Sequence, residues 1–260
     1  MTYLFSDLDS TLIFSKRYFE GTELEKEMIC IDQVEDHQYS FVHPEVQGKL
    51  LKLQQDQRFI PVTARNFRQY SLMSLLDYKK TQYAVISSGE VVLHYGEVDK
   101  EYQKHIAQTF EKEMRQLEKA EYILQKYFIP FRQMSEYTFL IKYHDVEEIW
   151  ERHQEQILLE LHLLGYHAMV TKTDTSHPQI IVQIQDLNKG FAVEYLQKKI
   201  RPAYSIASGD SEPDVSMLNV VHECIISPSF CLPNLKGQKK TILEESGIAF
   251  SRKLVRQLQN

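Results

Sequence analysis

Four polar sites in the sequence carry groups that could do chemistry, three at the ends of short apolar runs and one at the start of a helical pattern. Two carboxylates spaced two residues apart would point the same way on an extended chain and could share a cation. Taken singly, each site also has an ordinary explanation, namely a polar turn after a strand, a helix N-cap, a solvated lysine or a capped turn. The residues are Asp7 with Asp9, Thr63, Lys189, and Asp210 with Asp214.

The places of these residues relative to the predicted elements favour one shared site. Asp7, Thr63 and Asp210 each fall at the C-terminal end of a predicted parallel strand, and Lys189 opens the helix before the last of these strands. In open α/β sheets, ligand sites form beyond the carboxyl ends of the strands. We therefore expect several carboxylates, a hydroxyl and an ammonium to meet at that edge.

This mixture of groups suits a divalent cation and a phosphoryl group. Clustered carboxylates repel one another and are tolerated if a hard cation lies among them. Mg²⁺ is often bound by one or two carboxylates together with substrate phosphate, and a hydroxyl and a lysine suit the remaining phosphate oxygens. Because Asp is an established nucleophile toward phosphoryl groups, Asp7 is the candidate nucleophile and Asp9 the candidate for managing protons.

The elements that must position these groups are short apolar runs ending in polar or glycine residues. The runs do not alternate cleanly, which is typical of strands buried on both faces of a parallel sheet. Helical patterns such as Glu45–Gln55 and Lys189–Lys199 lie between several of them, and this alternation predicts a doubly wound α/β domain. The predicted strands are Tyr3–Phe5, Phe59–Val62, Tyr83–Ile86, Tyr204–Ala207 and Cys224–Ile226.

The middle of the chain has a different pattern and predicts an inserted second domain, residues 96–187, between two core segments, 1–95 and 188–260. The order helix, strand, strand, helix, strand, strand suggests two αββ halves. Clean alternation in the last strand indicates antiparallel pairing with one face in water. The predicted elements are a charged helix over Lys100–Lys126, strands at Phe128–Arg132 and Thr138–His144, a helix over Val146–Leu164, and strands at Tyr166–Thr171 and Gln179–Gln185.

One further segment, Lys16 to His43, follows the first pair of carboxylates directly. Within it, Ile29–Val34 and Tyr39–Val42 could form a hairpin around Glu35-Asp36-His37. Its place in the chain suggests that this hairpin flanks the mouth of the active site.

Together these residues resemble the haloacid dehalogenase (HAD) phosphatase superfamily, over essentially the whole chain. Asp7-Leu8-Asp9-Ser10-Thr11 matches the first motif, Asp-x-Asp-x-Thr, and Val62-Thr63-Ala64-Arg65 matches the second. Lys189 matches the third motif, and Gly209-Asp210-Ser211-x-x-Asp214 matches the fourth. Any one motif is weak, whereas four in the expected order are specific. The inserted domain resembles the αββαββ cap of the Cof-like subclass that contains sucrose-phosphate phosphatase and eukaryotic phosphomannomutase.

The resemblance implies the roles of the catalytic residues. Asp7 would attack phosphorus, and Asp9 would protonate the leaving oxygen and later activate water. Thr63 and Lys189 would hold the phosphoryl group. The enzyme would then be a phosphomonoester hydrolase working through an aspartyl-phosphate intermediate.

The resemblance also implies the metal ligands and the substrate contacts. Mg²⁺ would be bound by Asp7, by the backbone carbonyl of Asp9, by Asp210, and by Asp214 either directly or through a neighbour. Arg65 could touch substrate or seal the site, or simply begin a surface helix. The cap would close over the site, exclude water and select the leaving group. Its candidate contact residues are Glu136, Lys142, Lys172 and His177.

Three residues depart from the family pattern. Ser10 stands where many members have Gly, Ala64 replaces the Gly of Thr-Gly-Arg, and Pro213 stands where the subclass commonly has Asn. The last change removes a side-chain donor near the metal site and is the one feature favouring a catalytically weak binding or regulatory protein. A phosphomutase of the phosphomannomutase type, which would share Asp7 and Asp9, is the other alternative to a phosphatase.

The composition bounds the class of partner. The chain has 30 Lys and Arg against 36 Asp and Glu, a formal charge of -6, and so no general attraction for nucleic acid or an acidic membrane surface. No stretch approaches the roughly 18 apolar residues of a membrane span. The three cysteines are few and widely separated, which predicts reduced thiols in a cytoplasmic protein. We expect a small phosphorylated metabolite as the partner, such as a sugar phosphate, with Mg²⁺ as the cofactor.

Overall fold

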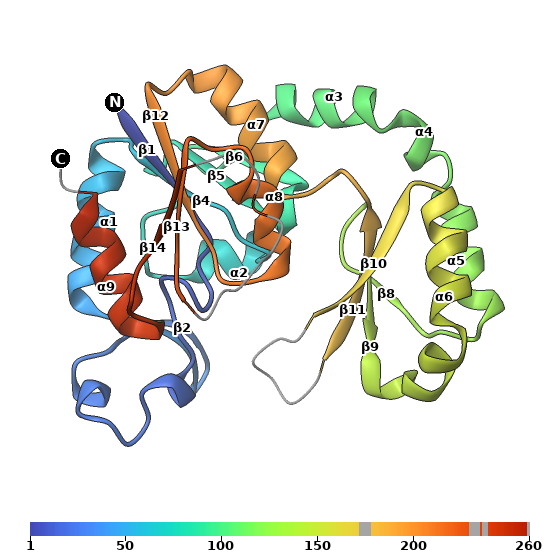
Figure 1. The fold of residues 1–260 in the computed structure, drawn as a ribbon, viewed down its shortest axis with the longest axis horizontal. Coiled ribbons are helices and arrows are strands. Elements are labelled where there is room, and N and C mark those ends of the chain that lie inside the picture. The colour runs from blue at the N-terminus through green and yellow to red at the C-terminus, as the bar shows by residue number, and fades with distance from the viewer. Residues whose placement is uncertain (172–177, 229–234, 236–238, 259–260) are drawn as a thin grey trace. The chain divides into compact units, whose positions relative to one another are not determined.

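A computed structural model describes residues 1–171, 178–228, 235 and 239–258 (Figure 1). The chain divides into two compact units, of which the first contains residues 1–103 and 188–260 and the second contains residues 104–187. The first unit thus extends past Gly96-Glu97, where the sequence suggested a junction. The candidate contact residues Lys172 and His177 lie outside the described residues, and so does Cys231, one of the three cysteines.

The centre of the first unit is a parallel sheet in the order β14-β13-β12-β1-β4. Four of its strands are mostly buried, as their apolar runs require, and the edge strand β14 is largely exposed. The expected α/β class with a parallel central sheet is confirmed. The strands are β1 (Thr2–Ser6), β4 (Phe59–Pro61), β12 (Tyr204–Ser208), β13 (Glu223–Ile226) and β14 (Lys239–Ile242).

The predicted strand Tyr83–Ile86, β5, is present, but it belongs to a separate small sheet and not to the parallel sheet. It pairs antiparallel with β6 (Val91–His94), which continues into β7 (Glu97–Val98). A single parallel bridge between Val62 and Val85 connects this small sheet to the end of β4. The antiparallel turn back arises because Ser87, Ser88 and Gly89 all adopt positive φ angles directly after β5.

Helices cover both faces of the parallel sheet, as in a doubly wound fold. In Figure 1, α1 (Pro44–Gln55) and α9 (Gly247–Gln257) lie side by side on one face, and α7 (Lys189–Ile200) with α8 (Val215–Leu218) on the other. A further short helix, α2 (Phe67–Leu72), follows β4.

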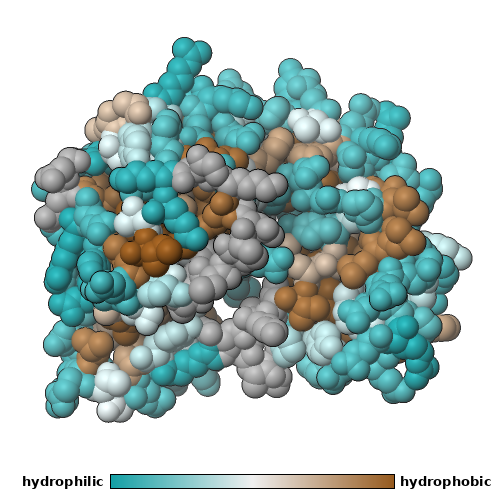
Figure 2. All heavy atoms as spheres, in the orientation of Figure 1, coloured by the Kyte–Doolittle hydropathy of each residue, from teal (hydrophilic) through white to brown (hydrophobic). Residues whose placement is uncertain are grey.

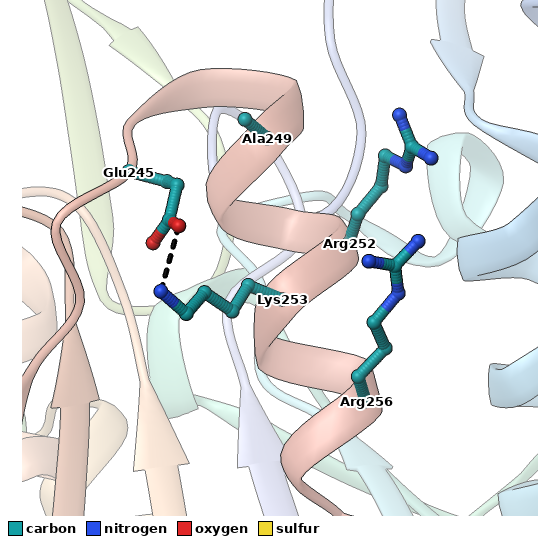
Figure 3. A pocket seen from close by; sticks show the side chains of 5 residues that line it. All are labelled: Glu245, Ala249, Arg252, Lys253 and Arg256. Atoms are coloured by element: carbon teal, nitrogen blue, oxygen red, sulfur yellow. Dashed lines mark hydrogen bonds and ion pairs between the residues drawn. The ribbon is translucent and has the colours of Figure 1, made fainter.

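Ion pairs tie α9 to α1 across the surface of that face. Arg252 Nε and Arg256 Nη2 donate to Glu45 Oε2 over 3.0 and 2.7 Å, and Arg256 chiefly, with Arg252, lowers the pKa of Glu45 to about 2. Figure 3 shows the same face of α9, where Lys253 pairs with Glu245. The three cations that line this shallow surface pocket therefore all form ion pairs with carboxylates.

The predicted hairpin is confirmed as β2 (Ile29–Val34) and β3 (His37–Val42), joined by a two-residue turn in which Glu35 has a φ of 54°. The hairpin is fastened to the first unit by reciprocal backbone hydrogen bonds of 2.9 Å between Phe14 and Phe41. A small apolar cluster of Phe14, Phe19, Phe41 and Ile248 packs beneath it. The hairpin therefore packs as part of the first unit.

The second unit has the expected αββαββ order. Its antiparallel sheet runs β10-β11-β9-β8, and the alternating Ile180, Val182 and Ile184 of β11 are buried as predicted. The elements after the first helical region are β8 (Arg132–Gln133), β9 (Thr138–Lys142), α6 (Glu147–Leu163), β10 (Tyr166–Thr171) and β11 (Gln179–Ile184).

Two predictions in this region are wrong. The stretch Lys100–Lys126 is three helices, α3 (Lys100–Thr109), α4 (Glu111–Met114) and α5 (Leu117–Lys126), because Phe110 and Gln116 leave helical geometry, with ψ angles of 21° and 1°. The apolar spacing continues across the breaks and so conceals them.

The strand expected at Phe128–Arg132 is reduced to β8. Phe128 instead adopts a left-handed φ of 56°, and the amides of Phe128 and Ile129 bond back to Gln125 and Leu124, which ends α5 as a C-terminal cap.

Hydrophilic side chains cover most of the face of each unit shown in Figure 2, with hydrophobic ones in smaller groups. Among the described residues, no helix has the length and apolarity to cross a membrane.

Candidate active site

The parallel register of β1 and β12 brings the first and fourth motifs together. Ser6 at the end of β1 pairs with Ser208 at the end of β12, and the Asp7 amide donates to the Ser208 carbonyl over 2.9 Å. The next side chains, Asp7 and Asp210, therefore leave the sheet at the same edge, as the crossover geometry of an open α/β sheet requires.

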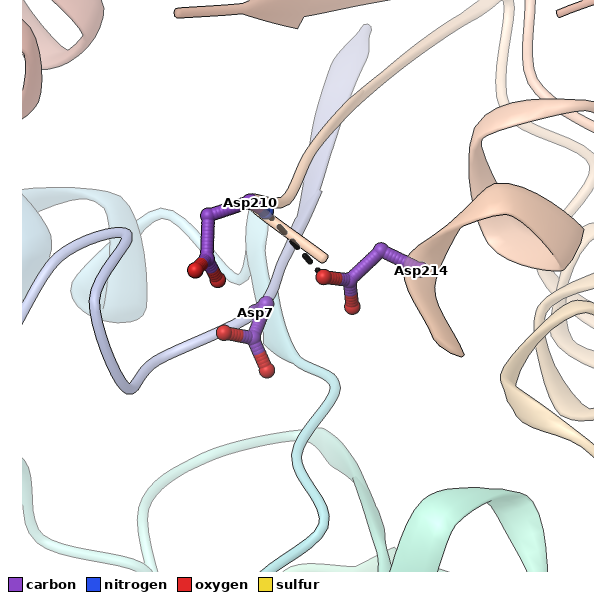
Figure 4. A group of neighbouring side chains, drawn as sticks. All are labelled: Asp7, Asp210 and Asp214. Carbon is purple, nitrogen blue, oxygen red and sulfur yellow. Dashed lines mark hydrogen bonds between the residues drawn. The ribbon is translucent and has the colours of Figure 1, made fainter. Parts of the chain in front are cut away.

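Three carboxylates gather at this edge. Oxygen atoms of Asp7, Asp210 and Asp214 all lie within 4.8 Å of one another (Figure 4). Burial, opposed in part by Lys189 and reinforced by the other carboxylates, raises the pKa of Asp7 well above its ordinary value of 3.8. Burial and the charge of Asp214 raise the pKa of Asp210 to about 6. The site therefore favours positive charge or protons.

One buried ammonium supplies part of that positive charge. Lys189 begins α7 after the N-cap Asn188, and its Nζ lies 2.6 Å from Asp7 Oδ1 and 2.6 Å from Asp214 Oδ1. Its side chain is 3% exposed. Burial lowers the pKa of Lys189, but Asp214 and Asp7 more than reverse this, so the net shift is upward and the lysine stays charged.

The fourth motif forms a tight turn around Asp214. Its Oδ1 accepts from Lys189, while its Oδ2 accepts from the amides of Asp210 and Ser211 and from the Ser211 hydroxyl, over 3.0 to 3.1 Å. Both oxygens are thus engaged. Gly209 permits this packing, because a Cβ there would lie 2.5 Å from the Asp214 Cβ and Cγ.

Thr11 is a residue of the site whose role the sequence analysis missed. Its hydroxyl lies 3.2 Å from Asp210 Oδ1 and 3.4 Å from Asp7 Oδ2, so it bridges two of the acids. The Thr at the end of the first motif was the available signal.

Thr63 is buried just beyond the end of β4, next to β1 in the sheet. Its amide donates to the Val85 carbonyl over 2.9 Å, and its hydroxyl accepts from the Arg65 amide over 3.1 Å. The hydroxyl is therefore fixed within the loop that follows the strand.

Asp9 is arranged differently from the other acids. Its carboxylate accepts from Arg65 Nε over 2.9 Å and Nη2 over 2.7 Å, a two-pronged ion pair. Arg65 Nη1 and Nη2 also donate to Asp32 and Ser40 of the hairpin, each over 2.7 Å. Arg65 is thus not a bare surface residue, and its contact with substrate stays a prediction. Sequence spacing gave no signal for either hairpin partner.

The departures from the family pattern have simple structural explanations. Ser10 adopts a φ of 62°, the left-handed region in which Gly is favoured, whereas Ala64 has no positive φ. Pro213 lies in the first turn of a short 3-10 helix, Glu212–Asp214, where a backbone N–H has no helical partner to lose. Ser211 supplies the side-chain donor to Asp214.

The donor set fits a hard divalent cation. Three carboxylates and one ammonium leave two formal negative charges in a largely buried space, and such a charge excess is tolerated when a cation neutralises it. The ligand atoms are all oxygen, which is the preference of Mg²⁺.

Comparisons with known proteins agree with this geometry. A family model described as haloacid dehalogenase-like hydrolase matches residues 45–226, which include Thr63, Lys189, Asp210 and Asp214. Asp7 and Asp9 precede the matched region. Among curated proteins, no sequence matches the chain.

Solved structures with low sequence identity share the fold. The C-terminal domain of trehalose-6-phosphate phosphatase from C. albicans has a TM-score of 0.61 at 14% identity, over 99% of this chain and 91% of that one. Sucrose-phosphatase from Synechocystis has a TM-score of 0.56 at 14% identity, over 98% and 97%. A haloacid dehalogenase-like hydrolase from Bacillus subtilis has a TM-score of 0.57 at 16% identity, over 98% and 91%.

Proposed function

The chain belongs to the haloacid dehalogenase-like hydrolase family, and on this premise we propose that it is a Mg²⁺-dependent phosphatase that acts on a small phosphorylated metabolite of the sugar phosphate class. The observation that carries the proposal is the buried group of Asp7, Asp210, Asp214 and Lys189. A bound cation would offset its excess of negative charge, and Lys189 and Thr63 offer donors to phosphate.

In the proposed reaction, an oxygen of Asp7 attacks phosphorus and the ester oxygen leaves. Asp9 gives that oxygen a proton, so an alcohol departs and Asp7 carries the phosphoryl group. Asp9 then takes a proton from water, which attacks phosphorus and releases inorganic phosphate, and Asp7 is regenerated. Mg²⁺, when bound by the acids, would offset negative charge on the phosphoryl oxygens.

Each residue of the site has a part in that sequence. Lys189 keeps Asp7 paired and offers its one remaining proton to the phosphoryl oxygens. Thr11 orients Asp7 and Asp210, and Asp214, with both oxygens engaged, holds Lys189 and the Asp210 loop in place. We assign Asp214 this supporting role and give the metal to Asp7, Asp210 and the Asp9 carbonyl.

The substrate class is supported by relatives of the same fold. Two are a trehalose-6-phosphate phosphatase and a sucrose-phosphatase by name. We assign the second unit as a cap that selects the leaving group, because it is inserted between the strand before Thr63 and the helix that begins at Lys189. The expected cytoplasmic location stays a prediction.

The test is phosphate release from a panel of phosphorylated sugars and other small metabolites, with Mg²⁺ or with EDTA. We expect release by the wild type in Mg²⁺ only, and its loss in Asp7→Asn, which keeps the volume of the side chain but removes the nucleophilic charge. Circular dichroism should show that both proteins are folded.

A folded, Mg²⁺-loaded wild type that released phosphate from no member of the panel would contradict the phosphatase proposal. Turnover that appeared only with a sugar bisphosphate activator would indicate a mutase instead. The alternative of a catalytically weak protein predicts tight ligand binding without turnover in the same panel; against it, Pro213 fits the first turn of its short helix and Asp214 accepts from the Ser211 hydroxyl.

A further inference from the structure

Arg65 joins the site to the hairpin through four hydrogen bonds. Two go to the carboxylate of Asp9, one to Asp32 and one to Ser40, with donor–acceptor distances of 2.7 to 2.9 Å. The guanidinium is planar and rigid, so partners on one side fix the direction of the bonds on the other. The orientation of Arg65 is therefore decided jointly by Asp9 and the hairpin.

The two hairpin partners lie opposite each other. Asp32 of β2 and Ser40 of β3 are a cross-strand pair, and the ladder is irregular on both sides of Asp32. Such an irregularity re-aims side chains that regular alternation would send elsewhere. Ser40 is 6% exposed and the Asp32 side chain 16%, so both contacts are sheltered from water.

The hairpin is also firmly held, which a positioning device requires. Phe14 and Phe41 bond to each other through their backbones, and the Ser74 amide donates to the Ile31 carbonyl, next to Asp32, over 2.7 Å. Ile31 is buried in the main core.

Asp9 itself has little else to hold it. Its side chain is 53% exposed, whereas that of Arg65 is 11% exposed. An exposed carboxylate samples several rotamers, and ordering it requires a partner that is already fixed. The sheltered guanidinium is that partner.

We propose that Asp32 and Ser40 are positioning residues that fix where the Asp9 carboxylate lies, because they hold the Arg65 guanidinium to which it is bonded. The inference rests on the proposed function, in which Asp9 transfers a proton to the leaving oxygen. That transfer needs hydrogen-bond geometry, and a misplacement of about 1 Å can lower a rate about a hundredfold. The hairpin would thus act on both proton transfers of Asp9, the one to the leaving oxygen and the one from the attacking water.

The experiment compares two esters of the same shape class, p-nitrophenyl phosphate and phenyl phosphate. The nitrophenolate leaves without help, whereas phenolate is more basic and needs a proton. For Asp32→Ala we expect kcat/KM, which covers the steps up to departure of the alcohol, to fall about tenfold with phenyl phosphate and less than about twofold with p-nitrophenyl phosphate. Ser40→Ala should show the same selectivity more weakly, and Ser40→Thr, which keeps the hydroxyl, should restore the rate.

The matched control is Asp36→Ala, which removes an exposed carboxylate from the turn of the same hairpin. It should leave both rates unchanged. An equal loss of kcat/KM on both esters in Asp32→Ala, or no loss on either, would overturn the inference while leaving the phosphatase proposal intact. Failure of the wild type to hydrolyse either ester would count against the phosphatase proposal, and the inference would fall with it.

A second measurement does not depend on activity. The Arg65 Nε–H is sheltered and bonded to Asp9, so its proton should exchange slowly with solvent in nuclear magnetic resonance spectra. We expect faster exchange in Asp32→Ala and wild-type exchange in Asp36→Ala. Unchanged protection in Asp32→Ala would show that the hairpin does not hold Arg65.

Discussion

Replacing Lys189 by methionine removes the one ammonium from the acidic group and keeps most of its volume. The group then carries three formal negative charges instead of two. Each Nζ–oxygen separation is 2.6 Å, which at an effective dielectric constant of about 20 corresponds to about 6 kcal/mol of attraction per pair before desolvation is subtracted. Breaking a buried pair by removing one partner typically costs about 3–5 kcal/mol. We expect the free energy of unfolding to fall by about that amount in EDTA at neutral pH.

The assay is urea unfolding followed by circular dichroism, with a second variant that separates charge from packing. In Lys189→Met/Asp214→Asn, the group returns to two formal negative charges. This double variant should regain part of the lost stability. Saturating Mg²⁺ should stabilise Lys189→Met as well, because the remaining carboxylates then have a counter-charge.

The control is Lys253→Met on α9. Lys253 also lies 2.6 Å from its partner, Glu245, but its side chain is 39% exposed, and exposed pairs contribute little. The reasoning would be refuted if Lys189→Met were no less stable than Lys253→Met, or if the double variant were no more stable than Lys189→Met.

Three further predictions concern the glycine of the fourth motif, the acids and the α1–α9 contact. Gly209→Ala should displace Asp214 and lower kcat by about a hundredfold, whereas Gly48→Ala, with open space on α1, should retain activity and gain about 0.5–1 kcal/mol of stability. In EDTA, the raised pKa of Asp210 stabilises the folded protein fully below pH 3.8, and this stabilisation is lost as the pH rises through about 6. Thermal melts over a series of pH values should show the loss in EDTA and no such loss in Mg²⁺. A Tm in EDTA that did not change with pH would contradict the prediction. Glu45 has a lowered pKa, so its stabilisation is present above 4.5 and lost toward pH 2. Glu45→Gln should therefore lower Tm by about 2 °C at pH 7, and the difference in Tm between variant and wild type should disappear toward pH 2.

The sequence was sufficient for the parts of the molecule that depend on local pattern. Buried parallel strands are continuously apolar, so β1, β4 and β12 could be placed within a residue or so. Because such strands end at a common edge, Asp7, Lys189 and Asp210 could be expected to meet. These residues lie far apart in the sequence, but the order of the strands in the sheet brings them together.

The remaining features depend on geometry that spacing does not encode. Phe110 interrupts a helix whose apolar period continues through it, so the pattern gave no sign of the break. The bonds from Arg65 to Asp32 and Ser40 depend on the register of a hairpin with an irregularity at Asp32. A one-residue shift in that register would turn both side chains to the other face, which no sequence argument could have settled.

The position of β1 in the sheet also bears on the order in which the protein is made. β1 lies between β4 and β12, and β12 is translated only after the whole second unit, 104–187. On the ribosome, the second unit is a continuous segment and can fold as a unit. Until β12 is made, the edge of β1 that will pair with it stays unpaired, and such an edge can associate with other chains. Asp7 and Lys189 thus meet late in synthesis, so any activity that needs both would be acquired only after residues 104–187 have been translated.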